Sequence, residues 1–200
     1  EKQLQKYDGA PKESQPYKVK SGEGNRPDFS VETYLKSILG TDVTQIEGFK
    51  VQSALKVLSE TGPNLKDKFP GAKNFTSWLN LVPNNKITGG KIIYSKMQRK
   101  KNNAGQAFRD AANGVQHSKG PLGQYYRTVK HRSGANKAKI ATARHIATIY
   151  YKLVTDQVEY DPTIMVDRQQ KSRNKKVEHY ERKLERLKQD ISENQRFALS

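Results

Sequence analysis

Residues 136–155, NKAKIATARHIATIYYKLVT, contain the clearest structural signal in the chain. Apolar side chains recur there at spacings of three and four, which is the period of an α-helix with one buried face. The opposite face is expected to be exposed to solvent, and it carries Lys137, Lys139, Arg144 and Lys152. The stretch therefore predicts a long amphipathic helix and makes a mainly α fold the expected class.

Similar patterns on the N-terminal side predict five shorter helices, at 31–40, 51–61, 72–81, 103–116 and 120–133. The first two are joined across a turn at Gly48, so that 31–62 resembles a helix–hairpin–helix unit. Two interpretations of this unit stay open: a plain helical hairpin, or a turn whose backbone amides receive a phosphate. Trp78 is expected in the core, with a stacking platform for a base as the alternative.

The remaining segments complete the expected domain organisation. Residues 1–30, rich in Pro and Gly, are predicted to be a linker or disordered tail, and a short extended or β arm is expected near 91–97. Residues 31–155 would form the main domain, with 72–155 as its catalytic or nucleic-acid-binding core. Residues 156–200 are predicted to form a long charged C-terminal helix. Its heptad-like apolar positions would pack on the same domain or form a dimer contact, and they are Val177, Tyr180, Leu184, Leu187 and Ile191.

The charge of the chain is concentrated in one segment. The net charge is +17, and residues 84–155 contain fifteen Lys or Arg residues against one acid, Asp110. A concentrated cationic field indicates a polyanionic partner, DNA or RNA. A membrane is the least favoured partner, because no apolar run approaches the roughly 20 residues needed to cross a bilayer. The absence of cysteine excludes a disulfide framework, a zinc ribbon and a thiol nucleophile, and we expect a cytoplasmic protein without a signal peptide.

Within this segment, residues 85–91, NKITGGK, combine a hydroxyl, two glycines and two lysines. The pattern suits either a passive phosphate-binding loop or a nucleophilic hydroxyl whose attack on a phosphodiester is stabilised by cations. Thr88 is the candidate nucleophile, and Ser95 is the runner-up. The candidate nucleic-acid-binding residues are Lys86, Gly89, Gly90, Lys91, Lys96, Arg99, Lys100, Lys101 and Arg109.

Two other kinds of site do not fit this sequence. A P-loop is excluded because Ile92 follows Gly90-Lys91 and Asn85 occupies the first glycine position. No metal site is predicted, since the four histidines are widely spaced and 84–155 has only one acid. No cofactor is expected in this chain.

Several motifs follow one another in an order that resembles a known family. They are Thr44-Gln45-Ile46-Glu47-Gly48, Phe75 to Pro83, Asn85 to Lys91, Arg109 to Ala112, Ser118 to Gly123 and Ala138 to Arg144. Together they resemble the C-terminal domain of the DEDD-type, bridge-RNA-guided insertion-sequence transposases of the 110 and 1111 groups, which are related to the Piv-type DNA invertases. The resemblance covers about residues 31–155.

The resemblance implies an enzyme built from two domains. An N-terminal RuvC-like domain, expected to be absent from this chain, would bind Mg²⁺ through four acids, and the C-terminal domain would supply a serine nucleophile. Thr88 stands at the position of that serine, and its extra methyl group restricts the hydroxyl. The implied partners are DNA, a structured guide RNA and further copies of the full-length protein, in the prokaryotic nucleoid. The implied function is DNA recombination in transposition, and the chain alone is expected to be inactive.

Two rival hypotheses use the same sequence features. The basic segment suits a non-catalytic nucleic-acid-binding remnant of a truncated transposase, whose binding would weaken steeply with salt. The apolar positions at 177–191 suit a helical dimerisation module.

Overall fold

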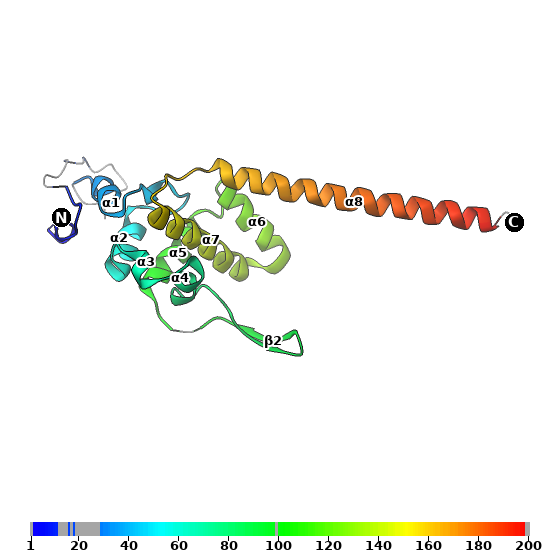
Figure 1. Ribbon diagram of the computed structural model, residues 1–200, viewed down its shortest axis with the longest axis horizontal. Helices are drawn as coiled ribbons and strands as arrows, with labels where there is room; N and C mark the ends of the chain where they lie inside the picture. Colours follow the sequence, from blue (N-terminus) through cyan, green and yellow to red (C-terminus); the bar gives the residue numbers. More distant parts are fainter. Residues whose placement is uncertain (1, 12–15, 17, 19–28, 99, 199–200) are drawn as a thin grey trace. The chain divides into compact units, whose positions relative to one another are not determined.

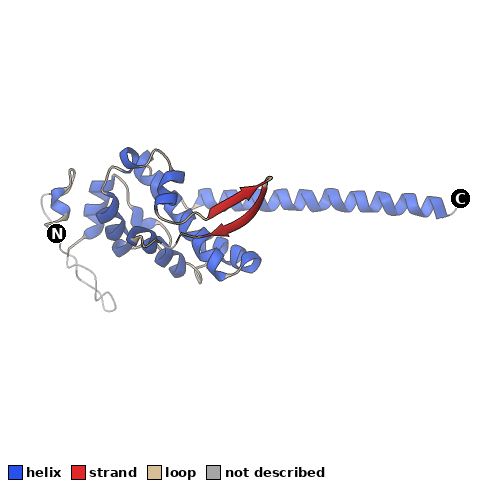
Figure 2. Ribbon diagram, turned by 90° about the horizontal axis from the view of Figure 1, so that it is seen from below, coloured by secondary structure: helices blue, strands red, loops and turns tan. Residues whose placement is uncertain are grey.

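The computed structural model describes residues 2–11, 16, 18, 29–98 and 100–198, and it divides into two compact units, 1–160 and 161–200 (Figure 1). Helices predominate, and the strands of the described residues form one two-stranded sheet (Figure 2). The prediction of a mainly α fold with a short β arm is confirmed. The elements in chain order are η1 (Leu4–Lys6), α1 (Val31–Leu39), η2 (Val43–Gln45), α2 (Val51–Thr61), α3 (Leu65–Lys68), α4 (Ala72–Trp78), β1 (Asn84–Thr88), β2 (Lys91–Lys96), α5 (Asn103–Gly114), α6 (Pro121–Ser133), α7 (Ala135–Asp156) and α8 (Thr163–Ala198).

The helix predicted at 136–155 is α7, and it is the central helix of the first unit. It packs against α3, α4, α5 and α6, while α2 packs on α5 (Figure 1). The buried face of α7 alternates small and large side chains, among them Ala143, Ile146, Ala147 and Tyr150. Alanines let neighbouring helices approach closely, and the larger side chains fill the space between them.

Four aromatic rings fill the centre of the first unit. Phe49 stacks on Phe108 with 5.0 Å between ring centroids, and Tyr150 lies 5.6 Å from Phe108. Phe75 meets Phe108 edge-to-face at 6.0 Å. All four rings are fully buried. Because they come from the turn before α2 and from α4, α5 and α7, this cluster joins segments that are far apart in the sequence.

Two adjacent tyrosines of α7 differ in how their hydroxyls are satisfied. The Tyr151 hydroxyl donates to the Phe69 carbonyl at 2.6 Å, whereas the buried Tyr150 hydroxyl has no hydrogen-bond partner among the described residues. Burial raises the pKa of Tyr150 far above the usual tyrosine value. The Tyr150 hydroxyl is therefore a cost to stability, and the Tyr151 hydroxyl contributes to stability.

We expect Tyr150→Phe to stabilise the chain by about 1 kcal/mol and Tyr151→Phe to destabilise it by about 1 kcal/mol, measured by urea denaturation at neutral pH. The alkaline behaviour of Tyr150 adds a second readout. Above the unfolded pKa of about 10, the unfolded chain releases the Tyr150 proton and the folded chain keeps it, so stability falls as pH rises. Tyr150→Phe should reduce that alkaline loss, and an unchanged alkaline slope would contradict the assignment.

The helical hairpin predicted at 31–62 is α1, η2 and α2, and its turn is packed against the rest of the unit. Gly48 has a φ of +79°, and a Cβ built on it would lie 2.6 Å from the Ala111 carbonyl oxygen. The neighbouring Glu47 accepts a hydrogen bond from the Leu122 backbone amide at 3.0 Å. The Glu47 carboxylate thus lies at the N-terminus of α6, where a negative charge complements the helix dipole. The hairpin is thereby fixed to both α5 and α6.

Three sequence-based expectations about 72–90 were wrong. The helix predicted at 72–81 ends at Trp78, and Asn80 follows with a φ of +54°. Trp78 was expected in the core but is 39% exposed, because it lies at the last turn of a short helix. Residues 84–88, expected to be part of a loop, form strand β1.

Most of the predicted tail at 1–30 lies outside the described residues, which omit 1, 12–15, 17 and 19–28. Of the part that is described, residues Leu4–Lys6 form a 3-10 turn, and Leu4 and Phe29 are buried.

The second unit contains the charged helix α8. Its 36 residues correspond to a length of about 54 Å at 1.5 Å per residue. Its apolar side chains at 177–191 are all about half exposed or more. Across the described ranges, neither this helix nor any other combines the length and apolar character that crossing a membrane requires.

Candidate nucleic-acid interface

The residues around Thr88 form a β-hairpin rather than an irregular loop. β1 and β2 pair antiparallel, with Thr88 opposite Lys91, and Gly89 and Gly90 make the two-residue turn. Both glycines have positive φ, +57° and +75°, as a type I′ hairpin turn requires. A Cβ built on either glycine meets nothing within 4 Å. The glycines therefore have a structural role in the turn, and they also leave the backbone beside Thr88 open to a ligand.

The pairing register assigns the predicted residues to two faces of the hairpin. Side chains alternate along a strand, and directly opposed residues share a face. Thr88 opposes Lys91, Lys86 opposes Tyr94, and Asn84 opposes Lys96. These three pairs lie on one face, which we call the basic face: Asn84, Lys86, Thr88, Lys91, Tyr94 and Lys96. The register thus brings the candidate nucleophile together with three of the predicted cations.

The opposite side of the hairpin has a different chemical character. Ile87 opposes Ile92, and Asn85 opposes Ser95, so these residues form a second face. The register shifts between Lys86 and Ile87, which leaves Ile93 as the extra residue of a β-bulge. The isoleucines are 59–70% exposed. Ser95, the runner-up nucleophile, therefore lies on the face away from Thr88 and the lysines.

The base of the hairpin is tied to the helices by side-chain hydrogen bonds to the backbone. The Asn80 amide donates to the Lys100 carbonyl at 3.0 Å, and Arg109 donates to the Asn80 carbonyl at 2.9 Å. Asn102 caps α5 by accepting from the Gly105 amide and also donates to the Trp78 carbonyl. These bonds anchor both ends of the arm, whereas every residue of the strands themselves is exposed. Along β1, Thr88 lies about 13 Å from Asn84, four steps of about 3.3 Å.

Arg109 lies on α5 rather than on the hairpin. Partial burial of its guanidinium lowers its pKa, and the nearby Asp110 carboxylate opposes that shift. The bond to Asn80 uses one of its several N–H groups. Lys100 and Lys101 lie just beyond the hairpin, and Arg99 lies outside the described residues.

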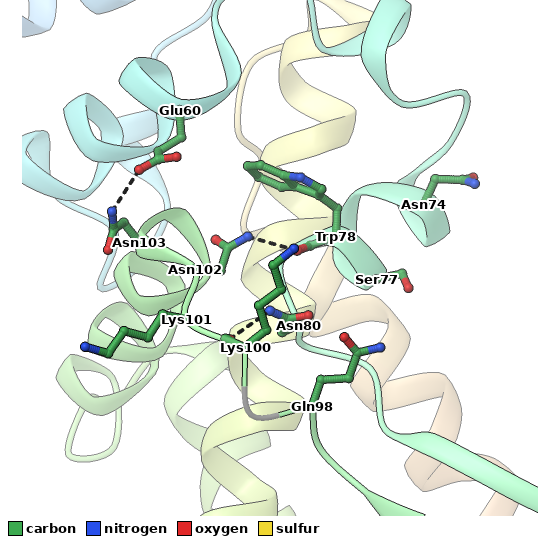
Figure 3. Close-up of a pocket in the computed structure, with 10 residues that line it drawn as sticks. All are labelled: Glu60, Asn74, Ser77, Trp78, Asn80, Gln98, Lys100, Lys101, Asn102 and Asn103. Carbon is green, nitrogen blue, oxygen red and sulfur yellow. Dashed lines mark hydrogen bonds between the residues drawn. The ribbon is translucent and has the colours of Figure 1, made fainter.

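A pocket of about 680 Å³ lies at the base of the hairpin, between α4 and the start of α5 (Figure 3). Trp78 forms part of its wall, together with amide side chains and the lysines that follow β2. Lys100 extends toward the indole ring, whereas Lys101 points away from it (Figure 3). Lys100 and Lys101 were predicted from the sequence, whereas Gln98 and Tyr94 were not, and Trp78 was expected in the core.

The acidic residues of the described ranges do not form a metal site. No group of three or more His, Cys, Asp or Glu residues lies close enough within those ranges to hold an ion. The donor set that a Mg²⁺ ion needs, several oxygens around one point, is not provided by the residues near Thr88.

Comparison with protein-family models places part of the chain in a known kind of domain. A model of the transposase IS116/IS110/IS902 family matches residues 40–127, which span α2 to the first half of α6 and include the whole hairpin. No curated protein matches the chain significantly. The match supports a transposase domain of this family, and with it a DNA transposase function with DNA as the partner.

Proposed function

We propose that the chain is the strand-transfer and DNA-binding part of a DNA transposase, with Thr88 as the nucleophile. The observation that carries this proposal is the register of the hairpin, which sets Thr88 beside Lys86 and Lys91 on one exposed face. A phosphodiester lying across that face would have its charge neutralised next to an accessible hydroxyl. The family match over 40–127 supports DNA as the substrate.

In the proposed step, the Thr88 hydroxyl oxygen attacks a DNA phosphorus atom. A bond forms between Oγ1 and phosphorus, and the bond from phosphorus to one deoxyribose oxygen breaks. The Thr88 proton is lost, and the departing deoxyribose oxygen takes up a proton to become a hydroxyl. Lys86 and Lys91 would stabilise the additional negative charge of the pentavalent transition state, an effect worth several kcal/mol in comparable sites.

The rest of the machinery in this proposal follows the family resemblance. A RuvC-like domain would supply the Mg²⁺ chemistry, a structured guide RNA would specify the DNA, and several copies of the full-length protein would assemble around it. The site of action would be the prokaryotic nucleoid. Guide-directed pairing would leave this chain to recognise the phosphate backbone, for which the basic face is suited.

Thr88→Ala is expected to lower formation of a covalent protein–DNA adduct at least about 1,000-fold, because it removes the attacking oxygen. The measurement is trapping on a nicked suicide substrate, with the chain joined to the RuvC-like domain and guide RNA of such a system. Thr88→Ser should retain the adduct, and mass spectrometry should place it on the peptide containing Thr88. Ser95→Ala is the matched control, since that hydroxyl lies on the opposite face. An adduct that survives Thr88→Ala would exclude Thr88 as the nucleophile.

One observation favours a second candidate function, passive nucleic-acid binding. The glycines at 89 and 90 are accounted for by the hairpin turn alone, without any close approach of a phosphate. In that case the basic face would bind backbone phosphates and Thr88 would only donate a hydrogen bond. The same trapping experiment separates the two functions, because a passive binder forms no adduct with any of the three variants.

A further inference from the structure

We propose that the pocket at Trp78 binds an unpaired nucleobase of a DNA or RNA strand. This inference deepens the proposed function by naming a form of nucleic acid that the chain would recognise apart from the hairpin. The ring centroid of Trp78 lies 5.2 Å from that of Phe69 and 6.5 Å from that of Phe75. Both phenylalanine rings are buried. The indole is thus held in place, yet 39% of the residue is exposed.

The polar side chains around the pocket fall into two groups. Asn80, Asn102 and Asn103 are engaged in hydrogen bonds that hold the hairpin base and the start of α5. Asn74 and Gln98, by contrast, make no side-chain hydrogen bond to any described residue. Side-chain amides offer a donor and an acceptor together, which is the pattern presented by the edges of nucleobases. The pocket therefore combines a fixed aromatic surface with amides that are available to a ligand.

The size of the pocket and one of its lysines fit the same ligand, and the one carboxylate in its lining, Glu60, accepts a hydrogen bond from Asn103. Its volume of about 680 Å³ lies within the range of about 300–1,000 Å³ typical of small-molecule sites. Lys100 extends along the pocket toward the indole (Figure 3), where its ammonium group can reach a phosphate attached to the bound nucleotide. Stacking on an aromatic side chain together with a lysine contact to the backbone is the usual mode of binding for single-stranded nucleic acid. A base within a duplex cannot reach the indole, because both of its faces are stacked.

The single tryptophan of the chain makes this site directly measurable. We expect single-stranded oligothymidylate to quench Trp78 fluorescence, whereas a duplex and a strand of abasic sugar-phosphate should bind without comparable quenching. Comparing the Trp78 quenching by oligouridylate with that by oligothymidylate shows whether the pocket prefers an RNA strand or a DNA strand. Trp78→Ala should weaken oligothymidylate binding by about 5- to 100-fold. Equal quenching by abasic and base-bearing strands would overturn the proposal.

A second pair of measurements separates this site from the hairpin. Gln98→Ala, which leaves the aromatic packing intact, should weaken oligothymidylate binding severalfold without changing duplex binding. Thr88→Ala should leave the quenching unchanged. If Thr88 proves not to form an adduct while Trp78 is still quenched, the proposed chemistry fails and the base site stands. If Trp78 is not quenched while the adduct forms, the base site fails alone.

A different observation, the surface of α8, carries a second inference: we infer that α8 pairs with the α8 of a second copy in antiparallel orientation. The exposed side chains of Val177, Tyr180, Leu184, Leu187 and Ile191 follow the a and d positions of a heptad. A groove of about 520 Å³ lies beside three of them, Val177, Tyr180 and Leu184, and Glu181 and Lys188 also line it. These two charged residues occupy e positions, where charges determine the orientation of a coiled coil.

The charges favour one arrangement over the others. In a parallel pair, Lys183 would face Lys188 of the second copy, which is repulsive, although Lys176 would face Glu181 favourably.

One antiparallel register layers Leu184 on Leu187 and Tyr180 on Ile191. In this register Glu181 of each copy faces Lys188 of the other, so the dimer contains two such attractive pairs. If the register is shifted by one heptad in one direction, Glu181 of one copy faces Glu181 of the other, and Lys183 faces Lys183. Both contacts are then between like charges. Shifting the register in the other direction sets Lys188 against Lys188, so the complementary register is distinguished from both neighbours.

Charge reversal at one position has opposite effects in the two orientations. Lys188→Glu should raise the dimer dissociation constant roughly tenfold in the antiparallel pair, because two attractive pairs become repulsive. In a parallel pair the same change would strengthen association. The double variant Glu181→Lys with Lys188→Glu should restore antiparallel affinity, and Lys175→Glu, at the solvent-facing f position, should have no effect.

Sedimentation equilibrium on the 200-residue chain measures these constants. A chain that stays monomeric at about 0.1 mM would overturn the inference, since even weak coiled coils associate at that concentration. Stronger association of Lys188→Glu would overturn the antiparallel orientation.

Discussion

Replacing Lys86, Lys91 and Lys96 together with glutamate is expected to weaken binding of duplex DNA by about 100-fold or more near 0.1 M salt. The hairpin register places these three lysines on one exposed face with Thr88. Each reversal removes a phosphate contact and adds a repulsive charge at the same point. Because bound lysines release counterions, the slope of log affinity against log salt should also become shallower by roughly three. Fluorescence anisotropy of a labelled duplex over a salt series measures both quantities.

The matched control for this experiment is the triple variant Lys56→Glu, Lys66→Glu and Lys73→Glu. It changes the net charge by the same amount, but its positions lie on α2, α3 and α4, outside the basic segment 84–155. We expect it to cost less than tenfold in affinity, through the long-range field alone. An equal loss in both triple variants would mean that the total charge, rather than the basic face, determines binding.

The helical part of the fold was predictable because it depends on local periodicity. The apolar spacing of α7 and the small-residue face of α5 are each repeated over three or more turns, and the side chains that set the pattern are largely those that are buried. The ends were also close to the expected positions, since Gly40, Gly62 and Gly134 lie immediately after α1, α2 and α6. What the pattern does not contain is the arrangement of the helices around the aromatic cluster, which depends on contacts between distant segments.

The hairpin shows why the candidate site was only partly predictable. The sequence of β1, NNKIT, has none of the enrichment in apolar or aromatic residues that marks a strand, because every one of its residues is exposed. The signal that could have identified it was Gly89-Gly90, a dipeptide that favours a two-residue hairpin turn. The face on which Ser95 lies follows from the pairing register of β1 and β2. Because β1 was not predicted, this register was unknown, and Ser95 could not be assigned to the face away from Thr88.

Trp78 was assigned to the core for an understandable physical reason. It is spaced three residues from Phe75, which is fully buried, so the pattern indicates a shared apolar face. The face is interrupted because α4 ends at Trp78 and the backbone reverses at Asn80, which the sequence alone did not indicate. The same interruption exposes the indole to the pocket at the hairpin base.

Gly48→Ala is expected to destabilise the first unit by about 3 kcal/mol or more, a large part of the stability of a typical domain. A Cβ at this position would lie 2.3 Å from Val115 Cγ1 and 2.6 Å from the Ala111 carbonyl oxygen. The backbone oxygen cannot move without distorting α5. The positive φ of Gly48 adds about 1–2 kcal/mol for any residue with a Cβ. Urea denaturation followed by circular dichroism measures the loss.

Gly114→Ala provides the matched control, because Gly114 lies on the other side of the same contact. It is helical, and the nearest atom to a Cβ built there is the Gly48 carbonyl oxygen at 4.0 Å. Alanine fits without strain and reduces the entropy of the unfolded chain, so we expect a gain of about 0.5–1 kcal/mol. Equal stability of the two variants would contradict the packing of the 31–62 hairpin on α5. Because α5 also anchors the hairpin base through Arg109, Gly48→Ala should lower DNA binding only in proportion to the fraction unfolded, in contrast to the lysine variants of a folded chain.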